Sequence, residues 1–175
     1  MINHFGGLRE SFEIDGKKYY INTDFRVWVE IDALLRNGNC QKALLLAFNE
    51  IPEDIKKAME CLILFLCLEQ KGKGKARKER LYDFKEDSGL ILSSFLREYN
   101  IDLRTEYLHW YTFITLLFTL SDDAPFSKAF YYRSSDPFSV KDRERRSFLK
   151  KMKKFYSLKQ EIKDSEIGET LGGAF

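Results

Sequence analysis

Two runs of apolar residues constrain the fold of this chain more than any other feature. They cover residues 61–68 and 107–120, and both are well short of the ~20 apolar residues that a helix needs to cross a bilayer. We therefore interpret them as core helices and expect no membrane contact. The first run is apolar on every face of a helix, which predicts that other elements surround it.

Apolar residues also recur at helical spacing along most of the chain. Three polar residues, Thr23, Asp83 and Asp136, precede such stretches and can cap helix N-termini, and we interpret Asp122 and Asp123 as caps as well. The spacing and these boundaries predict helices over about 25–37, 40–49, 53–70, 83–99, 104–120 and 139–159, and a short helix over about 126–132.

A tight β-hairpin is predicted near the N-terminus by the dipeptide Asp15-Gly16, because Gly accepts the positive φ that such turns need. β-prone residues flank it at 11–14 and 18–21. A two-stranded hairpin is only marginally stable alone in water. Its apolar side chains are therefore expected to pack on the helical body; they are Phe12, Ile14, Tyr19 and Ile21.

The chain length favours one core, since 175 residues with 44% hydrophobic side chains are too few for two. We predict a mainly α fold: a single domain of about six helices over 1–160, with the hairpin (8–22) packed on it. Glycines among lysines predict a flexible basic loop at 71–80, and 161–175 is predicted to be a mobile tail. Three cysteines and the absence of an apolar leader favour reduced thiols and a cytosolic protein.

The sequence contains no metal-binding or catalytic pattern. Neither of its 2 histidines, His4 and His109, has a Cys, His or carboxylate at ligand spacing. A phosphate-binding glycine loop and a nucleophile elbow are also absent. We expect no metal, no cofactor and no enzymatic activity, and we interpret His109 as a partly buried helix residue with one ring nitrogen bonded.

Positive charge is concentrated in two stretches, although the net charge is only +2. Residues 71–80 carry 6 basic and 1 acidic side chains, and residues 141–154 carry 8 and 2. We interpret them as a solvated loop and a solvated helix face. The alternative is a nucleic-acid or DNA-packaging role, disfavoured because no aromatic stacking platform accompanies the charges. Its candidate contacts are Lys73, Lys75, Arg77, Arg145, Arg146, Lys150 and Lys153.

Aromatic residues crowd the range 110–132. Most of them are expected in the core, where they would fix the last helices. The alternative is that some line an apolar groove for a partner helix, which would insert its i, i+3, i+4 and i+7 side chains. The candidate partner-binding residues are Trp110, Phe113, Phe126, Phe130, Tyr131, Tyr132 and Arg133. On the last helix a narrow apolar stripe is formed by Phe148, Met152, Phe155 and Tyr156.

Seven short segments are distinctive in combination: LRESFEIDG (8–16), INTDFR (21–26), YDFKED (82–87), LHWYTF (108–113), LSDD (120–123), FSK (126–128) and YRSSD (132–136). With them the sequence resembles the bacteriophage gene product fifteen family over about residues 8–158. The segments are not catalytic signatures, and the family carries no active-site residues to transfer. The stretch 71–80 departs from the family pattern.

This resemblance implies a protein of tailed phages or prophages of Gram-positive bacteria, encoded between the tail-tube and tape-measure genes. Proteins from that position are regarded as tail assembly chaperones. Such a chaperone keeps the long, helical tape-measure protein soluble until tube subunits replace it. The expected partners are the tape-measure protein, a second tail chaperone and further copies of the chain itself. The expected location is the host cytoplasm and not the mature virion.

Overall fold

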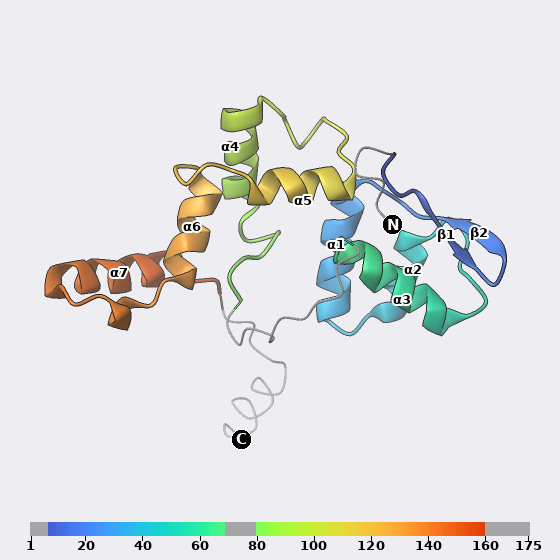
Figure 1. Ribbon diagram of the computed structural model, residues 1–175, viewed down its shortest axis with the longest axis horizontal. Coiled ribbons are helices and arrows are strands. Elements are labelled where there is room, and N and C mark those ends of the chain that lie inside the picture. Colours follow the sequence, from blue (N-terminus) through green and yellow to red (C-terminus); the bar gives the residue numbers. More distant parts are fainter. Residues whose placement is uncertain (1–6, 69–79, 160–175) are drawn as a thin grey trace, which may run out of the picture.

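The structure is a computed structural model that describes residues 7–68 and 80–159 (Figure 1). Within these ranges it is mainly helical and begins with an antiparallel hairpin, so the predicted fold class is confirmed. The predicted basic loop, apart from Arg80, and the predicted tail lie outside the described residues. The elements are β1 (Ser11–Ile14), β2 (Lys17–Tyr20), α1 (Phe25–Arg36), α2 (Cys40–Ala47), α3 (Ile55–Leu66), α4 (Ser88–Tyr99), α5 (Trp110–Phe118), α6 (Pro125–Ser134), the short 3-10 helix η1 (Pro137–Ser139) and α7 (Arg143–Phe155).

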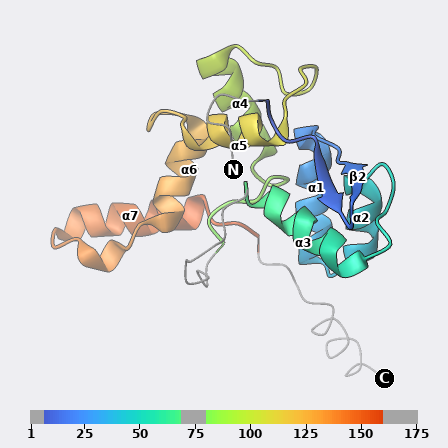
Figure 2. The same cartoon turned by 45° about the vertical axis from the view of Figure 1, so that its right-hand side comes forward.

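The hairpin forms as predicted and lies against α2 and α3 (Figure 2). Its turn places both Asp15 and Gly16 at positive φ, 52° and 77°, which explains why this dipeptide occurs there. β2 is followed by a bridge to the end of α2, where the amide of Asn22 donates to the carbonyl of Ala47 over 2.7 Å. The four apolar side chains expected to face the helical body are buried: Phe12, Ile14, Tyr19 and Ile21.

Helices α1 and α3 begin at aspartates. The carboxylate of Asp24 accepts from the amide of Arg26, and Asp54 caps α3. The prediction that Thr23 caps the first helix is wrong, because the Thr23 hydroxyl instead forms a hydrogen bond with the hydroxyl of Tyr107 over 2.6 Å. Helix α3 ends at Leu66, before residue 70, and its apolar run is not surrounded on every face, since the side chain of Ile63 is 43% exposed.

Helices α4 and α5 both begin later than predicted. The carboxylate of Asp83 accepts from the amides of residues 85 and 86, but this closes a separate turn, and α4 starts at Ser88. Asn100 ends α4 as predicted, with φ at 54°. The chain from 104 to 109 is not helical; the ring of His109 caps α5 by accepting from the amide of Tyr111.

The last helices are also capped by other residues than predicted. Ala124 precedes α6, while Asp122 and Asp123 are exposed and cap no helix. Asp136 caps η1, not the last helix. Helix α7 begins at Arg143, where Asp142 accepts from the amide of residue 145.

One contiguous cluster of buried apolar residues runs from the hairpin to α6. At its centre Trp28 of α1 packs on Phe65 of α3, with ring centroids 4.5 Å apart, and lies 6.1 Å from Trp110 of α5. Phe113 of α5 continues the cluster by stacking on Phe25 at 4.5 Å. Among the described residues no helix is long and apolar enough to span a bilayer.

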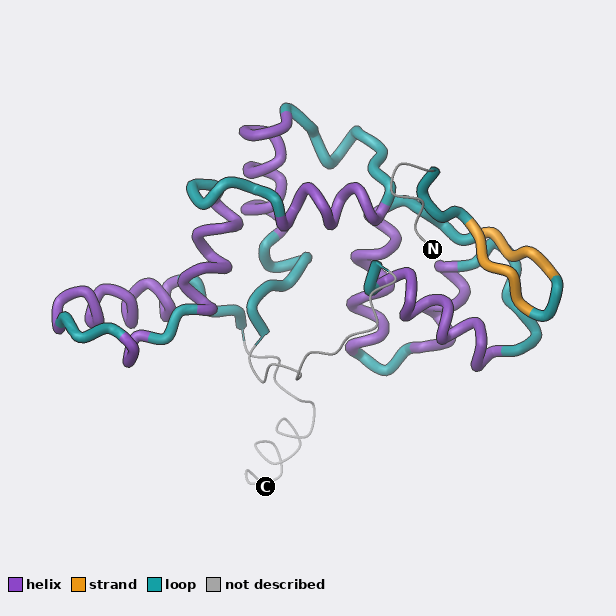
Figure 3. The backbone as a smooth tube through the Cα atoms, viewed as in Figure 1, coloured by secondary structure: helices purple, strands orange, loops and turns teal. Residues whose placement is uncertain are grey.

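Helix α7 lies outside this core. It packs on α6 and η1, and the backbone trace shows it extending away from the rest of the molecule (Figure 3). Its buried side chain, Leu149, is not part of the core cluster. We call residues 125–156, which comprise α6, η1, α7 and the C-cap of α7, the arm.

Candidate partner-binding surface

Five aromatic side chains form a second aromatic group on the arm, which we call the arm cluster; they are Tyr131, Tyr132, Phe148, Phe155 and Tyr156. Tyr132 is at its centre: its ring stacks on Tyr156, with centroids 5.6 Å apart and planes 8° apart, and meets the edges of its two other neighbours at 5.3 and 6.2 Å. Aromatic pairs at such distances stabilise one another beyond the area they bury.

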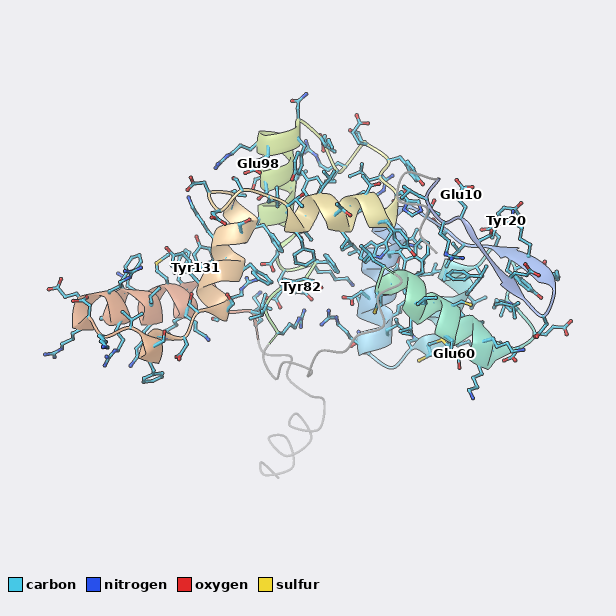
Figure 4. The ribbon with its side chains drawn as sticks, viewed as in Figure 1. Glu10, Tyr20, Glu60, Tyr82, Glu98 and Tyr131 are labelled. Atoms are coloured by element: carbon cyan, nitrogen blue, oxygen red, sulfur yellow. The ribbon has the colours of Figure 1, made fainter. Side chains whose placement is uncertain are left out.

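Three members of the arm cluster are open to solvent. The side chains of Tyr131, Phe148 and Phe155 are 54%, 52% and 75% exposed. Figure 4 shows Tyr131 on the arm, at the end of the molecule opposite to Tyr20. The three exposed rings are connected through the half-buried rings of Tyr132 and Tyr156, and exposed aromatic side chains grouped in this way are typical of surfaces that bind another molecule.

The exposed side of α7 is strongly basic. Seven of the 13 residues of α7 are Lys or Arg and one is acidic. Arg143, Lys150, Lys151 and Lys154 are exposed. The ammonium group of Lys150 lies 4.7 Å from the ring centroid of Phe138, which is itself largely exposed. The arm therefore combines apolar rings with cations, which suits an apolar partner that carries acidic groups.

A buried ion pair attaches the arm to the body. Both guanidinium nitrogens of Arg133 in α6 donate to the carboxylate of Asp87, which precedes α4, and both distances are 2.7 Å. The two side chains are 8% and 2% exposed. The carboxylate also accepts from the amide of Asp83 at 3.0 Å. Because each charge has its counterpart and further bonds, the pair is tolerated inside the protein.

Arg133 also holds the end of α7. Its remaining donors bind the carbonyls of Leu81 and Tyr156. Three residues after Tyr156, the amide of Lys159 donates a hydrogen bond to the carboxylate of Glu86 over 2.9 Å. We call Asp87, Arg133 and the carbonyls of Leu81 and Tyr156 the joint, because they fix both helices of the arm to the segment that leads into α4.

A separate cleft of about 250 Å³ lies between α1, α4 and α5. Its walls are mainly apolar, with Phe25, Ile91 and Phe113 among them, and two arginines lie at it. One of these, Arg104, pairs with Asp102 at 2.7 Å and, by hydrogen bonding, lowers the pKa of that carboxyl to about 2. Both arginines are held by aspartates of this chain, so among the described residues that line the cleft no charged group lacks a counterpart.

The amino-acid sequence matches the family described as Bacteriophage Gp15 protein over residues 7–158. The chain belongs to this family. It is therefore a bacteriophage protein, and the matched range includes the hairpin, the core and the whole arm. No curated protein and no solved structure matches the chain.

The structure of this Gp15-family chain separates the predicted partner-binding residues into two groups. Trp110, Phe113 and Phe126 are in the core, Phe130 is half-buried against it, and Arg133 belongs to the joint. The side chains of Trp110, Phe113, Phe126 and Arg133 are therefore buried, and that of Phe130 is only partly accessible. Tyr131 and Tyr132 belong to the arm cluster instead.

The arm cluster includes residues that the sequence analysis assigned to one apolar stripe of the last helix. The sequence alone does not say which way this stripe faces: in the structure Leu149, which is not part of it, faces inward, whereas Phe148 and Phe155 face solvent. Their separation by seven residues places them on one face, and that spacing is the signal that grouped them in the stripe. Met152 and Tyr156 are half-buried beside that face.

The residues predicted to contact nucleic acid differ in how accessible they are. Lys73, Lys75 and Arg77 lie outside the described residues. Arg145 and Lys150 are exposed on α7, whereas Arg146 is half-buried and donates to the carbonyl of residue 140 at 2.8 and 3.0 Å. Lys153 is half-buried and donates to the carbonyl of residue 135 at 3.3 Å.

His109 of this Gp15-family chain has a structural role. Both ring nitrogens are bonded, not one: Nε2 lies 3.0 Å from the carbonyl of Arg9, and Nδ1 accepts from the amide of Tyr111 at 3.1 Å. Burial lowers its pKa below the ordinary value of 6.5. Within the described ranges, no three His, Cys, Asp or Glu side chains gather in a way that could hold a metal ion.

Proposed function

We propose that this phage protein is a non-enzymatic tail assembly chaperone that binds the tape-measure protein through the arm cluster. The observation that supports it most is the exposure of Tyr131, Phe148 and Phe155 on the arm, none of which belongs to the core cluster. In this role the protein acts in the host cytoplasm before the tail is complete and is absent from the mature virion.

The shape of the arm cluster fits a partner that must later be displaced. A helical partner presents apolar side chains at i, i+3, i+4 and i+7, and a group of exposed rings can accept them without a deep pocket. Binding spread over several modest contacts dissociates faster than binding to one deep anchor. A chaperone that yields its partner to tube subunits needs such contacts.

The test is co-expression with the tape-measure protein encoded beside it, measuring how much tape measure stays soluble and co-purifies at high salt. The arm variant is Tyr131→Ser with Phe155→Ser. The matched control, Tyr20→Ser with Leu45→Ser, removes two apolar side chains that are 51% and 58% exposed, one after the hairpin turn in β2 and one in α2; Tyr20 lies at the other end of the molecule (Figure 4).

We expect the wild-type chain and the control variant to keep the tape measure soluble and bound, and the arm variant to lose at least about 90% of the complex, which corresponds to about 1.4 kcal/mol of binding free energy. Equal yields from both variants would remove the arm cluster from the proposal. An insoluble tape measure with the wild-type chain would refute direct chaperoning by this chain.

The second candidate is nucleic-acid binding, which the exposed cations of α7 favour. Binding that depends on phosphate contacts weakens steeply as salt rises, because counterions are released. We would measure the affinity for duplex DNA between low and physiological salt, with Lys150→Glu and Lys154→Glu as the arm variant. Strong, salt-sensitive binding that these changes abolish would support this role over the first.

A further inference from the structure

The segment that follows the arm has the opposite charge to α7. Residues 160–175 contain four acidic side chains and one basic side chain. Apolar residues are interspersed at positions 162, 167, 171 and 175. The segment lies outside both the described residues and the range that matches the family. Its composition, acidic with regularly placed apolar residues, is the complement of the exposed side of α7.

We propose that residues 160–175 dock on the arm of the same chain, across the exposed side of α7. Their acidic side chains would lie near Arg143, Lys150, Lys151 and Lys154, and their apolar side chains would cover Phe148 and Phe155. Opposite charges would give such a contact its orientation and most of its free energy, and the burial of apolar side chains would add to it.

The length and the starting point of the segment allow this contact. A helix of 13 residues is about 20 Å long at 1.5 Å per residue, whereas 16 extended residues reach about 50 Å. The segment starts directly after Lys159, which the hydrogen bond to Glu86 holds near the C-terminal end of α7. A short tether of this kind gives an effective concentration in the millimolar range, so even weak contacts are populated.

Helix α7 itself favours an acidic neighbour. Arg143 and Arg145 stand in its first turn, where the helix dipole disfavours positive charge. Glu144 is the acidic residue of the helix. An acidic segment across the exposed side would reduce the repulsion among the cations. The consequence for partner binding rests on the proposed function: the tape-measure protein would have to displace the segment before it binds the arm cluster.

The experiment is lysine acylation of the full chain, followed by mass spectrometry of its peptides. Lys151 and Lys154 report on the arm, and the exposed Lys42 and Lys56 report on the opposite end. The test variant neutralises the segment through Glu161→Gln, Asp164→Asn, Glu166→Gln and Glu169→Gln. The matched control neutralises four exposed carboxylates of the body through Glu13→Gln, Glu30→Gln, Glu53→Gln and Glu60→Gln.

If the segment is docked about two thirds of the time, the arm lysines should react about threefold faster in the test variant than in the wild-type chain. In the control variant the arm lysines should be acylated as fast as in the wild type. In the test variant the acylation rates of Lys42 and Lys56 should equal those of the wild type. About 1 M salt, which shortens the screening length to ~3 Å, should abolish the difference. Circular dichroism of each variant verifies that the helices are intact.

Two results would overturn the proposal. Equal acylation of Lys151 and Lys154 in the wild type and the test variant would show that the segment does not cover α7. If the protection of Lys151 and Lys154 from acylation grows with protein concentration, the segment docks on a second copy and not on its own chain. Neither result depends on the tape-measure protein, so failure here and failure of co-expression are separate outcomes.

Discussion

The joint offers the sharpest test of how the arm is held. Replacing Asp87 by Ala leaves the guanidinium of Arg133 buried without its counter-charge, and removes two hydrogen bonds of 2.7 Å and one of 3.0 Å to the amide of Asp83. Removing one partner of a buried ion pair costs about 3–5 kcal/mol. Because a domain of this kind is stable by only about 5–15 kcal/mol in total, the change is a large fraction of the whole.

The assay is equilibrium unfolding in urea. With a slope of about 2 kcal/mol per molar urea, a loss of 3–5 kcal/mol lowers the midpoint by about 1.5–2.5 M. Asp87→Asn is the milder variant, because it keeps the shape of the side chain and one acceptor for the guanidinium. It should unfold at an intermediate midpoint, and it keeps the test possible if Asp87→Ala does not fold.

The control is the exposed pair between Lys128 and Asp123, whose atoms lie 3.2 Å apart. Exposed ion pairs contribute at most about 1 kcal/mol, so Lys128→Ala should move the midpoint little. The double variant Asp87→Leu with Arg133→Met removes both buried charges together and should be more stable than Asp87→Ala alone. If Asp87→Ala shifts the midpoint no more than Lys128→Ala does, our account of the joint is wrong.

Three further predictions concern single groups. Burial lowers the pKa of His109 below 6.5, so the folded state binds fewer protons than the unfolded state, and the free energy of unfolding should fall as pH drops below 6.5. The variant His109→Asn keeps an N-cap acceptor but does not titrate. It should therefore flatten this pH dependence, measured by urea titrations from about pH 5 to 8. The carboxyl pKa of Asp102 should be about 2 by NMR titration and should rise in Arg104→Gln. Gly16→Ala should lower stability by about 1 kcal/mol in thermal unfolding, since φ is 77° there.

Much of the fold could be predicted from the sequence because its signals are local. The Asp15-Gly16 turn needs a conformation that few residue types adopt, and alternation along the hairpin decides which side chains are buried. The presence of each helix was predicted well for the same reason. The first residue of several helices was predicted poorly, because an aspartate caps a turn or a short 3-10 helix as readily as an α-helix. Asp83 and Asp136 do so, and the α-helices begin after Asp87 and Asp142.

The candidate site could be predicted only in part. Asp87 and Arg133 are 46 positions apart, and nothing in the sequence pairs them. The arm cluster depends on the phase of α7, and a shift by one residue rotates the assignment by about 100°. Periodicity groups Phe148 with Phe155 in one apolar stripe, but it does not show that these two rings face solvent while Leu149 takes the inward position. In a helix with so many cations, few apolar residues remain to determine that phase.

Helix α7 is short, and a helix of 13 residues that carries seven cations does not gain enough from its own hydrogen bonds to be stable alone in water. Its stability therefore comes from contacts, and on the inner side these are Leu149, the joint and the packing on α6. The rings of Phe148 and Phe155 add little to this, because more than half of each remains in water. Folding alone accordingly gives no reason for two phenylalanines seven residues apart on the outer side. A binding surface does give one, and an acidic, apolar partner would also reduce the repulsion among the cations that the inner contacts leave in place.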